Sequence, residues 1–125
     1  MELELLRTYL SEKKGSTEEF PFGPDALVVK VLGKIYAIIG WQHSPLRLSL
    51  KCRPDHALAL RAMHPAVQPG YHLNKEHWNT VTLDDTIPRD AVLEMIDHSY
   101  DIVVQGLKKS DRIRLENMDQ NQRLP

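Results

Sequence analysis

The sequence predicts an α+β fold in which helices pack on one face of an antiparallel β-sheet. Three observations predict it. Apolar residues recur at helical spacing near both ends of the chain, β-branched or alternating runs occupy the middle, and short turns join neighbouring segments. The predicted order is α-β-β-β-α-β-α. The chain has 125 residues, of which 42% are hydrophobic. We therefore assign residues 1–117 to a single domain and residues 118–125 to a polar tail.

The first predicted helix spans Glu2–Glu12. Its leucines recur at helical spacing, and Gly15 is placed to end it. Two prolines and a glycine in Ser16–Asp25 predict a loop without regular structure. The only two phenylalanines, Phe20 and Phe22, lie in this loop. We expect them to cover one edge of the core, and the alternative is that they grip a ligand.

Three strands follow. Ala26–Leu32 and Ile35–Trp41 are β-branched runs separated by Gly33-Lys34, which predicts a hairpin. After a turn at Gln42–Pro45, the run Leu46–Cys52 alternates, which is typical of a half-buried strand. Its core side would hold Leu46, Leu48, Leu50 and Cys52, and its solvent side Arg47, Ser49 and Lys51.

Pro54–Met63 reads as a short helix with proline in its first turn, and Pro65–Lys75 reads as an irregular loop. Trp78–Leu83 alternates again, so Val81 and Leu83 would face the core, with Trp78, Thr80 and Thr82 on the opposite face.

Pro88–Leu107 is the longest predicted helix. A further helical segment is expected over Asp111–Met118 with Ile113 and Leu115 inward, before a polar end at Asp119–Pro125.

Composition limits the classes of function. The sole cysteine, Cys52, excludes an internal disulfide and fits a reducing cytoplasm, while the acidic start of the chain does not resemble a signal peptide. The longest apolar run is far too short to cross a membrane. The formal net charge is −1. Residues 26–82 hold 7 basic and 2 acidic groups, a net charge of +5. Residues 1–25 hold 3 basic and 6 acidic groups, and residues 83–125 hold 6 basic and 9 acidic groups, so each of these segments has a net charge of −3. The middle of the chain is therefore positively charged. This pattern arises either by chance, together with acidic residues that cap helices, or because the segment binds a negatively charged partner.

Side chains capable of chemistry concentrate in residues 69–83. His72 and His77 are five positions apart, which separates them on a strand and on a helix, so we expect no metal site. A proton-transfer cluster of Tyr71, Lys75 and His77 has no support from spacing, and no nucleophile or phosphate-loop motif is present. We therefore expect no enzyme activity and no cofactor.

Nucleic-acid binding requires cations for phosphates and often aromatic side chains for bases. The alternating strands would place several cations and one aromatic side chain, Trp78, on or beside the solvent side of the sheet. The alternative is that Trp78 folds under the neighbouring loop and the cations are merely solvated. The candidate residues are Lys30, Lys34, Arg47, Lys51, Arg53, Lys75 and Trp78.

Several of these segments resemble the MmcQ/YjbR family. The similarity rests on HLNKEHWNTV at 72–81, LDD at 83–85, SY at 99–100, TEEFPFGP at 17–24 and the hairpin at 29–34, and it covers residues 1–117. The signature residues are His72, Asn74, Lys75, His77 and Trp78. The resemblance implies a bacterial domain with a fold like CyaY or the type III secretion chaperones, and a DNA-binding role by analogy with a "double-wing" arrangement of strands.

These observations lead to one expected function and one alternative. We expect a cytoplasmic monomer that binds DNA through the basic sheet face and the 69–80 loop. The alternative is a protein- or peptide-binding module with an exposed apolar patch that includes Trp41 and Trp78. No membrane partner is expected. The five signature residues have a structural alternative, in which Asn74 would bond backbone groups in its loop and Trp78 would close the end of the sheet.

Overall fold

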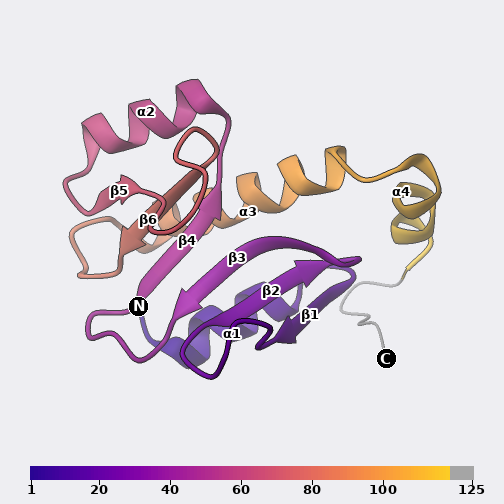
Figure 1. The fold of residues 1–125 in the computed structure, drawn as a ribbon, viewed down its shortest axis with the longest axis horizontal. Coiled ribbons are helices and arrows are strands. Elements are labelled where there is room, and N and C mark those ends of the chain that lie inside the picture. Colours follow the sequence, from indigo (N-terminus) through magenta and orange to yellow (C-terminus); the bar gives the residue numbers. More distant parts are fainter. Residues whose placement is uncertain (119–125) are drawn as a thin grey trace.

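The computed structural model describes residues 1–118, which form six strands and four helices (Figure 1). The strands are β1 (Ser16–Glu19), β2 (Leu27–Val31), β3 (Lys34–Gly40), β4 (Arg47–Lys51), β5 (Val67–Pro69) and β6 (Trp78–Thr82). The helices are α1 (Leu3–Ser11), α2 (Pro54–Met63), α3 (Arg89–Gln105) and α4 (Lys109–Glu116). All strands pair antiparallel in the order β1-β2-β3-β4-β6-β5, so the predicted α+β class is confirmed.

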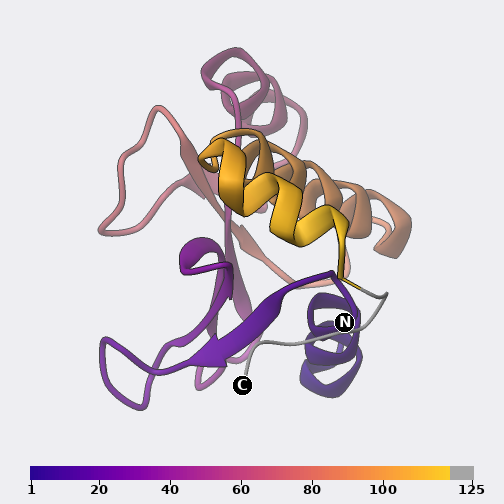
Figure 2. The same ribbon diagram turned by 90° about the vertical axis from the view of Figure 1, so that its right-hand side faces the viewer.

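One face of the sheet carries the core. Figures 1 and 2 show the helices gathered on this side, with α3 crossing behind β3 and β4. Leu48 and Leu50 of β4 are buried here, as the alternation predicted. They pair with buried residues of the strands on either side. We call the opposite side of the sheet the open face, because none of the helices within residues 1–118 lies over it (Figure 2).

The sheet separates between the start of β3 and the end of β4, and α3 fills the gap. The β3–β4 pairing ends at Ala37 and Leu50. Beyond this point, the Ser99 hydroxyl accepts a hydrogen bond from the Lys51 amide at 2.9 Å and donates one to the Tyr36 carbonyl at 2.6 Å. Ser99 is fully buried. A single side chain of α3 therefore joins two strands that no longer pair directly.

The two edge strands were missed. β1 lies within the predicted loop Ser16–Asp25, and β5 lies within the predicted loop Pro65–Lys75. β1 consists of STEE, which lacks the β-branched apolar run that marks a strand, and β5 has only three residues and ends in Pro69. Backbone pairing to a neighbouring strand forms both, and that pairing leaves little trace in side-chain pattern.

Three predictions about individual side chains are wrong. Phe20 and Phe22 are 52% and 67% exposed, so they do not cover the core. Ile113 of α4 is also exposed, whereas Leu115 packs inward as expected. In this short helix, residues two apart point to different sides, so they cannot both be buried. The predicted polar end at 119–125 lies outside the described residues.

Candidate binding face

The register of β4 with β6 determines which side chains share the open face. Arg47 pairs with Thr82, Ser49 with Thr80 and Lys51 with Trp78. Directly opposed residues on antiparallel strands point to the same side. The alternation of the two strands predicted this shared side, and the register confirms it. Ser49 and Thr80 were expected to face solvent, however, and both are buried. Arg47 is exposed, and Lys51 and Trp78 are half-buried.

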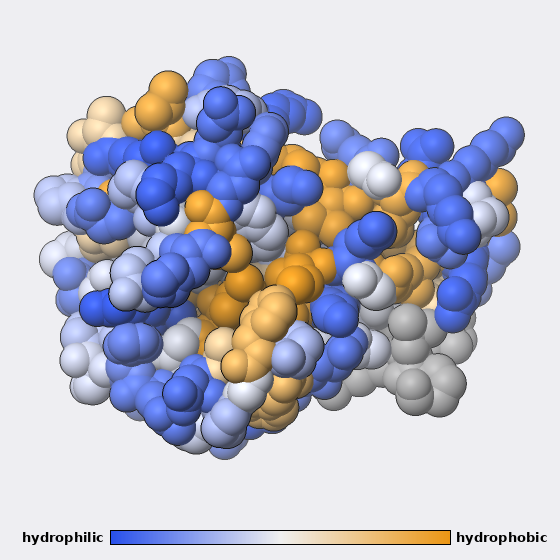
Figure 3. Space-filling model, viewed as in Figure 1, coloured by the Kyte–Doolittle hydropathy of each residue, from blue (hydrophilic) through white to orange (hydrophobic). Residues whose placement is uncertain are grey.

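Two loops project from the open face and leave a groove between them. Figure 2 shows the loop that joins β1 to β2 and the loop that joins β5 to β6 extending to the same side, away from the helices. The groove has a volume of about 300 Å³. One loop contributes Phe22 and Ala26 to its walls, and the other contributes Tyr71, His72 and Leu73. Figure 3 shows apolar side chains gathered over the centre of this face, between polar margins.

Two hydroxyl groups lie at the floor of the groove. Ser49 and Thr80 line it from neighbouring strands, and their side-chain oxygens are 2.8 Å apart. The Thr80 oxygen also accepts a hydrogen bond from the Tyr71 amide at 3.1 Å, which ties the loop to the sheet. Both residues are less than 10% exposed, 8% for Ser49 and 7% for Thr80. The groove therefore has mainly apolar walls, which also include His43, Arg47 and His72, and a small polar floor.

Loop 20–26, which forms the first wall, is held by Trp41. The indole nitrogen donates a hydrogen bond to the Pro24 carbonyl at 2.8 Å. Trp41 is half-buried and packs against the core, so it does not form the exposed patch expected for a protein-binding surface. The exposed aromatic residues near the groove are instead Phe20, Phe22 and Tyr71.

Loop 70–77, which forms the second wall, is held mainly by its own signature residues. The Asn74 side chain accepts a hydrogen bond from the Glu76 amide at 2.9 Å, as predicted for a residue that bonds backbone groups. The Lys75 ammonium donates to the Gly70 carbonyl at 3.1 Å. Gly70 lies so close to Trp78 that an added Cβ would be 2.7 Å from the Trp78 Cβ. These contacts give Asn74, Lys75 and Gly70 a structural role in shaping the loop.

Arg61 of α2 also anchors loop 70–77, through hydrogen bonds from its guanidinium group. Its guanidinium donates to the Asn79 side chain at 2.7 Å, to the Trp78 carbonyl at 3.3 Å and to the Lys75 carbonyl. Sequence reasoning missed this residue, because its partners are backbone carbonyls distant in sequence. Only the folded chain shows that α2, β6 and the loop meet at one side chain.

The seven candidate nucleic-acid contacts do not form one cluster. Lys30 pairs with Glu19 at 3.2 Å, and Arg53 is exposed at the start of α2. Lys34 and Lys51 line a second hollow, beside Ile35 and α3. Arg47 lies in the wall of the groove. The open face therefore carries cations at separate points along β4, with apolar surface between them.

His72 and His77 have different surroundings. His72 is exposed, has a positive φ of 59° and lies against the Tyr71 ring with ring centres 4.1 Å apart. His77 is half-buried, and its carbonyl accepts a hydrogen bond from the Cys52 amide at 2.7 Å. Residues 1–118 contain no group of three or more His, Cys, Asp or Glu side chains placed to hold a metal ion. Burial raises the pKa of the Cys52 thiol to about 11, which disfavours a reactive thiolate.

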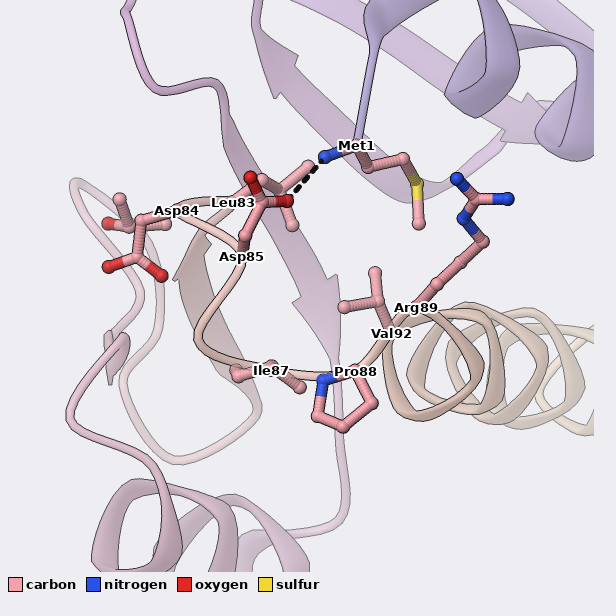
Figure 4. A pocket seen from close by; sticks show the side chains of 9 residues that line it. Met1, Leu83, Asp84, Asp85, Ile87, Pro88, Arg89 and Val92 are labelled. Atoms are coloured by element: carbon pink, nitrogen blue, oxygen red, sulfur yellow. Dashed lines mark hydrogen bonds and ion pairs between the residues drawn. The ribbon is translucent and has the colours of Figure 1, made fainter.

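Another hollow, of about 170 Å³, lies where the chain turns from β6 into α3 (Figure 4). Here the amino group of Met1 contacts the Asp85 carboxylate at 3.2 Å. Asp84 is turned the other way and accepts hydrogen bonds from the Thr86 hydroxyl and amide, which hold the pKa of Asp84 below its usual value. The Met1 amino group and the two carboxylates here already have partners within the chain, so we place the candidate site in the groove.

The fold and the open face define a small α+β domain whose candidate binding surface consists of a sheet and two loops. The chain belongs to the YjbR family, whose family model matches residues 11–102. It is 32% identical over 112 residues to the uncharacterized protein YjbR of Escherichia coli K12, covering 90% of this chain and 95% of that one. It is 34% identical over 96 residues to the uncharacterized protein YbdF of Escherichia coli O157:H7, covering 77% and 79%.

Solved structures share the fold. The Deinococcus radiodurans protein DR2400 superimposes with a TM-score of 0.86 at 43% identity, covering 94% of this chain and 90% of that one. A crystal structure of a Pseudomonas syringae protein matches with a TM-score of 0.70 at 26% identity, covering 82% and 98%. None of the helices within residues 1–118 is both long and apolar enough to span a bilayer.

Proposed function

We propose that this protein binds nucleic acid through the open face, without catalysing a reaction. The observation that carries the proposal is the pairing of Arg47 with Thr82 and of Lys51 with Trp78, which places two cations, an indole and hydroxyl groups on the open face. Cations on such a face can contact phosphates, while aromatic rings and hydroxyl groups can contact bases and sugars.

Charge along β4 supports this proposal. Arg47 and Lys51 have no salt-bridge partner within the described part of the chain, in contrast to Lys30, which pairs with Glu19. The Lys34 side chain lies near Lys51 in the adjacent hollow. Lys34 pairs with the core residue Val31, so the register places it on the other side of the sheet. Arg47 and Lys51 therefore remain available on the open face for weak, salt-sensitive binding of a polyanion.

The apolar walls of the groove suit a second class of ligand. Most of the exposed surface there comes from apolar and aromatic side chains, among them Phe22 and Leu73. An extended peptide with apolar side chains is therefore the alternative ligand for the same face. The two proposals differ in their dependence on salt, because only a polyanion releases counterions when it binds.

The test is fluorescence anisotropy of labelled DNA oligonucleotides at increasing salt concentration. We expect Arg47→Ala and Lys51→Ala each to weaken binding and to lower the slope of log K against log salt by roughly 0.7–0.9 for each phosphate interaction that the variant removes. Lys109→Ala is the matched control, because Lys109 is an exposed cation at the start of α4. The proposal fails if no salt-dependent binding is detected at low ionic strength, or if the control weakens binding as much as the open-face variants do.

A further inference from the structure

We infer that the groove between the two loops takes one unpaired base, so that the ligand of the open face is single-stranded nucleic acid. The inference rests on the proposed function and makes it more specific. It concerns the part of the face that is apolar, whereas the proposal above concerns the cations at its margins.

The groove has the size and the walls that a single base requires. Its volume of about 300 Å³ is at the lower end of the range for small-molecule sites. Phe22 and Tyr71 enter it from opposite loops and are 67% and 66% exposed. Two large aromatic side chains left in water on either side of one groove are available to stack against a flat ring, and base–aromatic stacking is tolerant of sequence.

Tyr71 is held in place for such contact. Its amide donates to Thr80 at 3.1 Å, and its ring lies against His72 at an interplanar angle of 54°. The positive φ of His72 gives the chain the turn that brings the two rings together. One wall of the groove is therefore ordered by the sheet beneath it, which lowers the entropic cost of stacking a ligand there.

The floor of the groove supplies a hydrogen-bond donor. Ser49 and Thr80 share one hydrogen bond, and the Thr80 oxygen accepts another from the Tyr71 amide. Two hydroxyl groups contain two hydrogens, and the shared bond uses one of them. Whichever residue donates, one hydroxyl hydrogen remains available to a carbonyl oxygen. All common bases except adenine carry such an oxygen.

The cations are placed for the flanking phosphates. Arg47 lines the groove itself. Lys51 lies four residues further along β4, about 13 Å away at the rise of a strand, and shares the second hollow with Lys34. A strand of a few nucleotides spans that distance. In duplex DNA both faces of each base are already stacked on neighbours, so the aromatic walls favour unpaired bases.

The experiment compares a fluorescein-labelled 12-nucleotide oligothymidine with a hairpin duplex of equal charge. We expect Phe22→Ala and Tyr71→Ala to weaken binding of the single strand roughly tenfold and to leave duplex binding within about twofold. Tyr71→Phe, which keeps the ring, should retain the affinity. Phe20→Ala is the matched control, because Phe20 lies in the same loop and is 52% exposed but does not line the groove.

The outcomes separate the inference from the proposed function. One outcome is salt-sensitive binding that Phe22→Ala and Tyr71→Ala leave unchanged, and another is binding that these substitutions weaken equally for duplex and single strand. Either outcome overturns the inference and leaves the proposal of nucleic-acid binding intact. Absence of any salt-sensitive binding overturns both. Displacement of the oligonucleotide by a short apolar peptide at equal affinity also overturns the inference, because it assigns the groove to a peptide. Unchanged thermal melting of each variant shows that the folded state is being compared.

Discussion

The Ser99 side chain forms hydrogen bonds to β3 and β4 at the point where these two strands no longer pair with each other. It bonds the Lys51 amide and the Tyr36 carbonyl, two backbone groups that have no strand partner where β3 and β4 separate. The next residue, Tyr100, donates to the Lys14 carbonyl at 2.8 Å, and its ring meets the Tyr36 ring edge to face at 5.2 Å. The SY pair of the family resemblance therefore has a structural explanation, because it attaches α3 to the sheet and to the segment between α1 and β1.

Replacement of Ser99 by alanine should destabilise the fold. It leaves a buried amide and a buried carbonyl without partners, so we expect a loss of about 2–4 kcal/mol in the free energy of unfolding. Urea denaturation followed by circular dichroism measures this. Ser110→Ala, at an exposed position of α4, serves as the control and should change stability by less than about 0.5 kcal/mol. A similar, small change in both variants would contradict the bridging role.

Among the elements, the 70–77 loop depends on a residue outside itself. Arg61 of α2 binds the carbonyls of Lys75 and Trp78 as well as the Asn79 side chain. The Gly70 amide in turn donates to the Trp78 carbonyl at 2.8 Å. The loop that forms one wall of the groove is thus attached to a helix on the far side of β6, and its shape depends on that helix.

Arg61→Met should loosen this loop without unfolding the domain. We expect stability to fall by about 1–2 kcal/mol, and exchange of the Gly70 and His77 amides with solvent to accelerate by roughly tenfold. Hydrogen exchange followed by NMR measures the effect residue by residue. Arg114→Met on the exposed side of α4 is the matched control. Uniform acceleration across β4 and β6 would instead indicate global destabilisation and argue against a local anchor.

The elements also differ in how far sequence predicts them. The Leu46–Cys52 run was predicted almost to the residue, because its alternation reflects burial of one side only. β1 and β5 were missed because an edge strand is formed by pairing to its neighbour, which side-chain pattern does not record. The same reason explains the candidate site. The strands' alternation predicted which of their residues lie on the open side, whereas the position of Phe22 and Tyr71 in the walls of one groove depends on how two distant loops project.

For the molecule as a whole, three tyrosine hydroxyl groups and one cysteine thiol make the stability of the fold sensitive to high pH. Burial raises the pKa of Tyr9 and of Tyr100 to about 12, and it also raises the pKa of Tyr36. The Cys52 thiol has a pKa of about 11 for the same reason. Each group keeps its proton in the folded state at a pH where the unfolded chain has released it. The contribution of these groups to stability is therefore complete well below pH 9, the ordinary pKa of a cysteine thiol, and is lost as pH rises.

Cys52 should account for the first part of this decline. Between pH 9 and 11 its contribution is a loss of about 1.4 kcal/mol for each pH unit, and the tyrosines add to it above pH 10. Guanidinium denaturation at half-unit steps from pH 8 to 10.5 measures the slope. Cys52→Ala removes a buried side chain, which lowers stability at every pH, but it should flatten the curve between pH 9 and 10. An unchanged slope in that variant would exclude the thiol as the cause.

The alternation of β4 has a consequence for divergence among relatives. Positions 48 and 50 point into the core, while positions 47, 49 and 51 point outward. Exchange of Arg47 or Lys51 leaves the hydrophobic interior unaltered, so the side chains on this face can differ from species to species while the framework stays constant. The same independence makes the strand a convenient starting point for engineering new specificities, one outward position at a time.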